Sequence, residues 1–150
     1  MNTATTQLEQ MTGFLRGDMQ AVKFCDDLFA LTQTWDDLVD GDREVTPETV
    51  NRAFWRALVE LPQNPFYQRY MRELHPVLRG FFNDWFDANA LEDGDVHERT
   101  LSFVLRDAIG GIVGQCAYLV GGYEWMRQVS PDIRRMIHDE HLEDYLRGLK

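Results

Sequence analysis

Apolar residues recur every three or four positions along most of this chain, and that spacing constrains the fold more than any other feature of the sequence. Side chains three and four residues apart share one face of an α-helix, so the pattern predicts helices that each bury one face. The longest example runs from Tyr67 to Trp85. The sequence therefore predicts an all-α fold, an antiparallel bundle of six or seven helices.

Helix start signals divide this pattern into elements. Thr46 before Pro47 and Asn64 before Pro65 are combinations typical of a first helical turn. Asp95 with Glu98 three residues later resembles a capping box. A kink or a break is expected at Pro76 and Gly80. The predicted helices cover residues 3–15, 18–40, 47–61, 65–90, 96–123 and the segment from Ser130 onward, and the apolar helix 96–123 is the expected centre of the bundle.

The length of 150 residues is that of one ordinary domain, and no linker or repeat divides it, so residues 1–150 are predicted to form a single all-helical domain. Cys25 and Cys116 both lie in apolar helical segments, where free thiols behave as small apolar side chains. The polar N-terminus does not resemble a signal peptide. These features together predict a cytoplasmic protein with reduced thiols.

The charge balance, 15 basic against 25 acidic residues for a net charge of −10, argues against a nucleic-acid partner. A phosphate backbone is bound by a basic surface, which this composition does not offer. The most apolar segment, AIGGIVGQCAYLVGGY, contains Gln115 and is shorter than the ~20 apolar residues of a membrane span. No membrane-spanning segment is therefore expected.

The segment from Phe24 to Asp42 is the one that suggests a chemistry. At about 100° per residue, its larger apolar side chains form one stripe that predicts a core-facing side. The opposite side is apolar near its start and polar near its end, as in a helix that also lines a cavity with a polar mouth. The residues predicted to line this cavity are Val22, Phe29 and Gln33.

Three carboxylates, Asp36, Asp37 and Asp40, lie in the last turns of the same helix. Each costs about 0.3–1 kcal/mol there because the helix dipole already places negative charge at a C-terminus. A bound cation would remove this conflict, and Asp36 and Asp40 share one face at a spacing that suits Mg²⁺. The alternative is an acidic surface patch, since charged residues are common in ordinary domains.

The run Asp36-Asp37-Leu38-Val39-Asp40 resembles the DDxxD motif of class I isoprenoid and terpenoid synthases. The resemblance covers about twenty residues, and it implies a terpenoid-synthase-like helical fold, Mg²⁺ as cofactor and a prenyl diphosphate as ligand. It also implies that Arg106 contacts the diphosphate, with Arg52 and Arg56 as helpers, although ion pairing and simple exposure are the alternatives. Enzymes of that family are longer, and a homodimer could supply the missing walls.

The family mechanism needs a second acidic face, for which Asp139, Glu140 and Glu143 are the candidates. This face departs from the family's second motif, so a solvated acidic helix is the alternative. The whole chain also resembles small uncharacterised bacteriophage proteins, which implies a location in the host cytoplasm but no activity. Two functions stay open: a Mg²⁺-dependent diphosphate-binding protein and a non-catalytic interaction protein.

Overall fold

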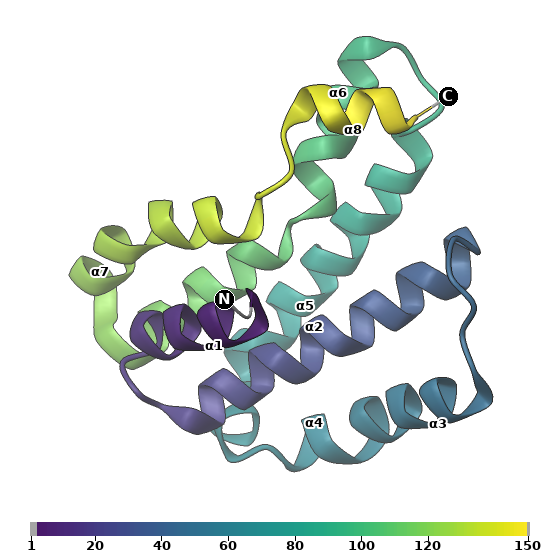
Figure 1. The fold of residues 1–150 in the computed structure, drawn as a ribbon. Helices are drawn as coiled ribbons and strands as arrows, with labels where there is room; N and C mark the ends of the chain where they lie inside the picture. The colour runs from purple at the N-terminus through teal and green to yellow at the C-terminus, as the bar shows by residue number, and fades with distance from the viewer. Residues whose placement is uncertain (1–2, 150) are drawn as a thin grey trace. The chain divides into compact units, whose positions relative to one another are not determined.

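The computed structural model describes the backbone of residues 3–149 and the side chains of residues 6–149. Within this part of the chain the protein is all-helical and contains no strand, which confirms the all-α part of the predicted fold (Figure 1). The elements are α1 (Thr3–Phe14), α2 (Met19–Asp40), α3 (Pro47–Trp55), the π-helical turn η1 (Arg56–Glu60), α4 (Leu61–Gln63), α5 (Pro65–Leu91), α6 (Val96–Arg106), α7 (Ile109–Ile137) and α8 (Leu142–Gly148).

Contacts between residues group the chain into two compact units, residues 1–71 and residues 72–150. The boundary lies within α5, after Met71. The preceding residue, Tyr70, interrupts that helix with φ of −112° and ψ of 18°. A kink or a break was expected at Pro76 and Gly80, and the helix is broken at neither residue, since its non-helical backbone angles are at Tyr70. The prediction of a single domain stays a prediction.

In residues 1–71 the elements pack around α2, which contacts α1, α3, η1 and α4. The Asp18 side chain accepts hydrogen bonds from the backbone N–H groups of Gln20 and Ala21, so it caps the start of α2. Gly41 ends the helix in the left-handed conformation, with φ of 68°. Phe24 is fully buried and stacks on Tyr67 with 5.5 Å between ring centroids. The predicted start and end of this helix are confirmed.

The segment from α3 to α4 buries a different face from the one predicted. Phe54 and Leu58 follow the apolar spacing of the predicted helix 47–61, which places them on its core-facing side. In the structure they are 60% and 71% exposed, whereas Ala53 is buried. A π-helical turn immediately precedes Pro62 and is closed by a bond from the Leu61 N–H to the Arg56 carbonyl. Proline lacks an N–H, and its ring clashes with the carbonyl four residues earlier, so a wider turn before it relieves both problems. This turn shifts the register of the helix.

In residues 72–150 the predicted helix over residues 96–123 is two helices, so that prediction is wrong. The capping box of Asp95 and Glu98 begins α6 as expected. The helix ends at Asp107, with φ of −102° and ψ of 30°, and α7 begins two residues later. Gly110 and Gly111 follow at once, and because glycine costs about 1 kcal/mol in a helix interior, this stretch favours a new start over continuation.

The helix α7 reverses direction at Gly122, whose φ of 84° and ψ of −173° are not helical (Figure 1). The predicted helix start at Ser130 is wrong, because α7 continues through Pro131. Burial explains this continuity: Val129, Ile133 and Met136 form a regular stripe in the core, which outweighs the hydrogen bond lost at the proline.

Both cysteines, Cys25 and Cys116, are free and buried, as expected. Among the described residues one helical stretch, within Val96–Gly148, is long and apolar enough to cross a membrane by length and composition alone. A core helix of a globular protein meets the same criterion.

Candidate functional site

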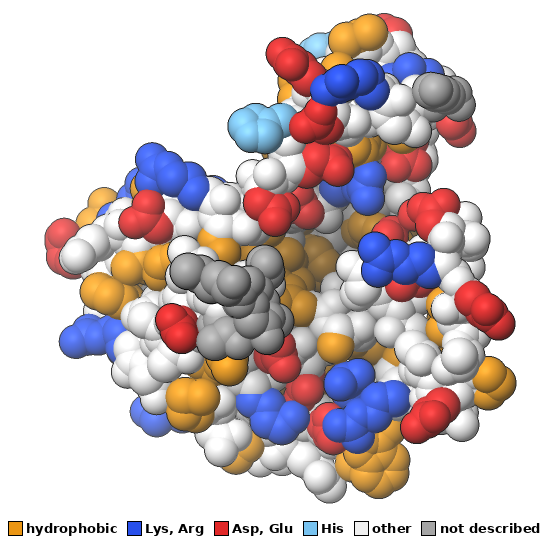
Figure 2. Space-filling model, in the orientation of Figure 1, with side chains coloured by type: hydrophobic (Ala, Val, Ile, Leu, Met, Phe, Trp, Pro, Cys, Tyr) orange, Lys and Arg blue, Asp and Glu red, His pale blue; other side chains and the backbone are white. Residues whose placement is uncertain are grey.

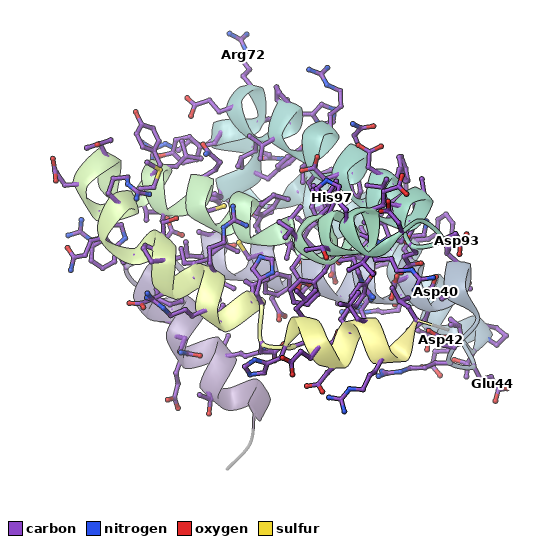
Figure 3. All side chains as sticks on the ribbon, turned by 90° about the horizontal axis from the view of Figure 1, so that it is seen from above. Asp40, Asp42, Glu44, Arg72, Asp93 and His97 are labelled. Carbon is purple, nitrogen blue, oxygen red and sulfur yellow. The ribbon has the colours of Figure 1, made fainter. Side chains whose placement is uncertain are left out.

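The aspartates of the DDxxD-like run lie in the last two turns of α2. Asp40 is exposed, whereas Asp36 and Asp37 are half-buried, and Asp37 accepts a 3.0 Å hydrogen bond from the Gln33 side-chain amide. Figure 3 shows Asp40 near Asp42 and Glu44 of the following link. No basic residue lies in the last turn of α2, so no side chain of that turn offsets the negative end of the helix dipole.

No three His, Cys, Asp or Glu side chains within residues 6–149 lie close enough together to hold a metal ion. A cation at the end of α2 would therefore have to draw the carboxylates together as it binds. The second acidic set is also dispersed: Asp139 and Glu140 lie in the link between α7 and α8, and Glu143 lies in the first turn of α8. All three are exposed, and Figure 2 shows acidic and basic side chains side by side over α8.

The predicted cavity-lining residues of α2 differ in exposure. Val22 is buried with 2% of its surface exposed, Phe29 is half-buried and Gln33 is exposed. Val22 therefore belongs to the core of residues 1–71. Leu38 and Val39, expected in the core-facing stripe, are 50% and 56% exposed, so the apolar packing of α2 ends before its last turns.

A buried carboxylate that the sequence analysis did not single out, Asp27, lies at the interface of α2 and η1. Lys23 Nζ donates a 2.7 Å hydrogen bond to its Oδ2 atom, and Arg56 Nε lies 3.7 Å from Oδ1. Glu60 lies 3.3 Å from Arg52 and 3.7 Å from Lys23. We call these five residues the charge cluster, and Figure 2 shows acidic and basic side chains adjoining over this part of residues 1–71.

The charge cluster gives Arg52 and Arg56 partners within their own unit. Arg56 Nε and Glu60 Oε2 are buried without a hydrogen bond, and these two residues are the first and last of the π-helical turn. The hydrogen bond to Asp27 raises the pKa of the Lys23 ammonium. The sequence held one signal for this cluster: Asp27 follows Lys23 by four residues and lies about 60° from Phe24 on the helix.

Arg106, the predicted diphosphate ligand, has partners in residues 72–150. Its Nη1 atom lies 3.8 Å from Glu92, and its guanidinium carbon lies 5.0 Å from the centre of the Tyr145 ring. The Tyr145 hydroxyl is 2.9 Å from Ser102 Oγ, which donates a 2.7 Å bond to the Ala88 carbonyl. These bonds attach α8 to α5 and α6, and they are buried.

A pocket of about 690 Å³ opens between α5, α6 and α7. Its apolar wall comes from Val104, Leu105, Ala108 and Gly111. Its charged lining residues are Asp84, Arg134, Arg135 and His138. The volume falls within the roughly 300–1,000 Å³ of small-molecule sites, which are typically apolar with a few convergent polar groups. One sequence feature adjoins it: small residues recur at Gly110, Gly114, Ala117 and Gly121, a spacing that allows either close approach of another helix or room for a ligand.

Asp107 lies next to this pocket and pairs with one of its lining residues. His138 Nδ1 is 3.4 Å from Asp107 Oδ2. Burial raises the pKa of the Asp107 carboxyl above its ordinary value, while His138 and Arg106 act in the opposite direction. Asp139 and Glu140 also raise it. Burial is therefore the main reason that this carboxyl favours its protonated form.

No family model, curated protein or solved structure matches this chain.

Proposed function

We propose that this protein binds a small, largely apolar ligand in the pocket of residues 72–150. The observation that carries the proposal is the pocket itself, about 690 Å³ with an apolar wall formed by α6 and the start of α7. Burial of apolar surface favours binding by roughly 25 cal/mol per Å², so such a wall can hold the body of a ligand without any covalent chemistry. This proposal belongs to the class of interaction proteins and assigns no reaction.

A substitution that fills the pocket tests this proposal. Ala108 lines the pocket, and Ala108→Phe should occupy part of its volume. We expect aliphatic and aromatic probe molecules to shift the amide NMR signal of Gly111 in the wild type and to lose this effect in the variant. Ala90→Phe is the matched control, because Ala90 is exposed on α5 and does not line the pocket. Probe binding that Ala108→Phe leaves unchanged would contradict the proposal.

The second proposal is that the end of α2 binds Mg²⁺ and a diphosphate in a terpenoid-synthase-like bundle. It is supported by Asp36, Asp37 and Asp40 in a helix end without a basic residue in its last turn. A divalent cation would stabilise this end by offsetting the helix dipole and the mutual repulsion of the acids. The homodimer belongs to this proposal as well, whereas the host-cytoplasm location rests on the resemblance to bacteriophage proteins and applies to either proposal.

A further inference from the structure

We infer that Arg134 binds the head group of the pocket's ligand, and that this ligand is a singly charged amphipathic carboxylate. The inference rests on the proposed function, because it names the chemistry of the same pocket. It adds a residue that the sequence analysis did not consider and a ligand class that differs from a diphosphate.

The position of Arg134 depends on two glycines at the start of α7. A Cβ atom on Gly110 would lie 2.8 Å from Arg134 Nη1, and one on Gly111 would lie 3.6 Å from Nη2. The first distance is shorter than real Cβ contacts, so any larger residue at position 110 would displace the guanidinium. Gly114, one turn further along, has open space at the corresponding place. The start of α7 is thus shaped to seat this arginine against the pocket wall.

Arg134 differs from the other cations of the pocket in its partners. Arg135 forms a 2.6 Å ion pair with Asp132, and His138 lies next to Asp107. The Arg134 guanidinium makes no hydrogen bond or ion pair with any residue in the described part of the chain. A guanidinium presents two parallel N–H donors that match the two oxygens of a carboxylate.

The backbone at the start of α7 does not compete for this role. The Gly110 N–H donates a 3.1 Å bond to the Asp107 carbonyl, and the Gly111 N–H donates a 2.9 Å bond to the Ala108 carbonyl. Both groups are therefore satisfied within the chain. Charge recognition in this pocket falls on the side chain of Arg134.

The surrounding charges favour a ligand with one negative charge. The Arg134 guanidinium can balance one negative charge on the ligand. Asp84 in the pocket lining and Asp107 beside the pocket would repel any further negative charge. A diphosphate carries more charge than one guanidinium offsets in such surroundings. The other ionisable groups of the pocket lining are Asp84 of α5 and Arg135 and His138 of α7 with its C-cap, and the acidic partners of the last two are Asp132 and Asp107.

The rest of the lining suits an apolar chain attached to the carboxylate. Val104, Leu105 and Ala108 form a continuous stretch of the wall from α6 into the α6–α7 link. A ligand with its carboxylate on Arg134 places its chain along this wall, where each buried methylene contributes about 0.8 kcal/mol. Octanoate is a suitable probe, and octan-1-ol is its neutral counterpart of the same length.

The test compares octanoate, octan-1-ol and inorganic pyrophosphate by following the Gly111 amide signal in NMR titrations of the full chain. We expect octanoate to bind about ten-fold tighter than octan-1-ol, the size of effect expected for a hydrogen bond to a charged group. Arg134→Gln should remove this advantage and leave octan-1-ol binding unchanged. Arg134 is exposed, so the variant should fold, and its melting temperature checks this.

Two further substitutions test the geometry. Gly110→Ala should displace the guanidinium and weaken octanoate binding while octan-1-ol binding persists. Gly114→Ala is its matched control, since a Cβ there meets no atom within 4 Å. Arg135→Gln is the control for charge, because Arg135 lines the same pocket but is paired with Asp132. Both controls should keep the preference for octanoate.

The outcomes separate this inference from the proposed function. Equal binding of octanoate and octan-1-ol, or equal weakening of both by Arg134→Gln, would overturn the role of Arg134 while the pocket remains a binding site. Tighter binding of pyrophosphate than of octanoate would contradict the inference that the ligand carries a single negative charge. Absence of any shift at Gly111 with all three probes would contradict the inference and the proposed function together.

Discussion

Lys23 donates a 2.7 Å hydrogen bond to Asp27, a carboxylate whose side chain is only 6% exposed. The lysine itself is 51% exposed, so the pair joins a buried anion to a cation that remains hydrated. Removal of the lysine and removal of the aspartate therefore affect stability differently. Loss of the lysine leaves a buried charge short of a donor, whereas loss of the aspartate leaves a cation that water can solvate.

This asymmetry predicts the outcome of a double-mutant cycle in residues 1–71. Lys23→Met should lower the free energy of unfolding by roughly 1–3 kcal/mol, because Asp27 stays buried without its best donor. The same substitution in an Asp27→Asn background should lower the free energy of unfolding by a smaller amount. Urea denaturation measures both values, and Asp26→Asn is the control, because Asp26 is exposed on the same helix. A coupling energy below about 0.5 kcal/mol would show that the pair behaves like a surface ion pair.

The attachment of α8 predicts a second stability effect. Tyr145→Phe removes the hydroxyl beside Ser102 and should cost about 1 kcal/mol, because Ser102 keeps its bond to the Ala88 carbonyl. Amide hydrogen exchange should also become faster in α8. Tyr118→Phe, at an exposed position of α7, is the control and should change neither quantity. Unchanged exchange in α8 of the Tyr145→Phe variant would show that ring packing alone holds this helix.

The raised pKa of Asp107 predicts a pH dependence of stability in residues 72–150. Because the folded protein favours the protonated carboxyl, its contribution is fully present below the ordinary pKa of 3.8 and is lost as the pH rises through the higher folded value. Asp107→Asn should remove this loss, so the variant should gain stability relative to the wild type as the pH rises through that range. Urea denaturation at a series of pH values measures it, with the exposed Asp87→Asn as control. A difference that stays constant with pH would contradict the prediction.

The Mg²⁺ proposal makes its own prediction at the end of α2. Calorimetric titration should give heat with Mg²⁺ and pyrophosphate in the wild type and none in the Asp36→Asn/Asp40→Asn double variant. Without metal, the same variant should melt at a higher temperature, because acids at a helix C-terminus each cost about 0.3–1 kcal/mol. Equal heats in both proteins would contradict metal binding at these residues.

Catalysis is a separate question, for which the expected result is negative. A diphosphate needs several basic groups in addition to metal, and Arg106, Arg52 and Arg56 each already have an acidic neighbour within 4.0 Å. We expect no transfer or cyclisation of geranyl or farnesyl diphosphate by the purified protein. Release of pyrophosphate that depends on both Mg²⁺ and Asp36 would show the opposite.

Local signals predicted the helix boundaries that depend on local chemistry. The caps at Asp18, Thr46 and Asp95 and the left-handed Gly41 are visible in the sequence because each needs only residues within one turn. Periodicity failed for Phe54 and Leu58, since the π-helical turn before Pro62 alters the face that the helix buries. That shift comes from the wider turn before the proline, which a regular period of 3.6 residues does not include.

The pocket could not be predicted for a similar reason. Its residues come from Asp84, the segment 104–111 and the segment 134–138, which are far apart in sequence. The signals that led to the aspartates of α2 were charge and spacing within one helix. Arg134 carries no such local signal, because the feature that distinguishes it is its position over Gly110.

That position depends on a residue outside the pocket. The backbone of Gly122 has φ of 84° and ψ of −173°, a region that is essentially restricted to glycine, and it returns the second half of α7 toward its own first turn. A side chain at this position would oppose the reversal by about 1–3 kcal/mol without touching Arg134 or the apolar wall. Substitutions that abolish ligand binding are therefore expected at Gly122, where α7 reverses, as well as at the residues that line the pocket. A survey of variants confined to the lining would miss those at Gly122.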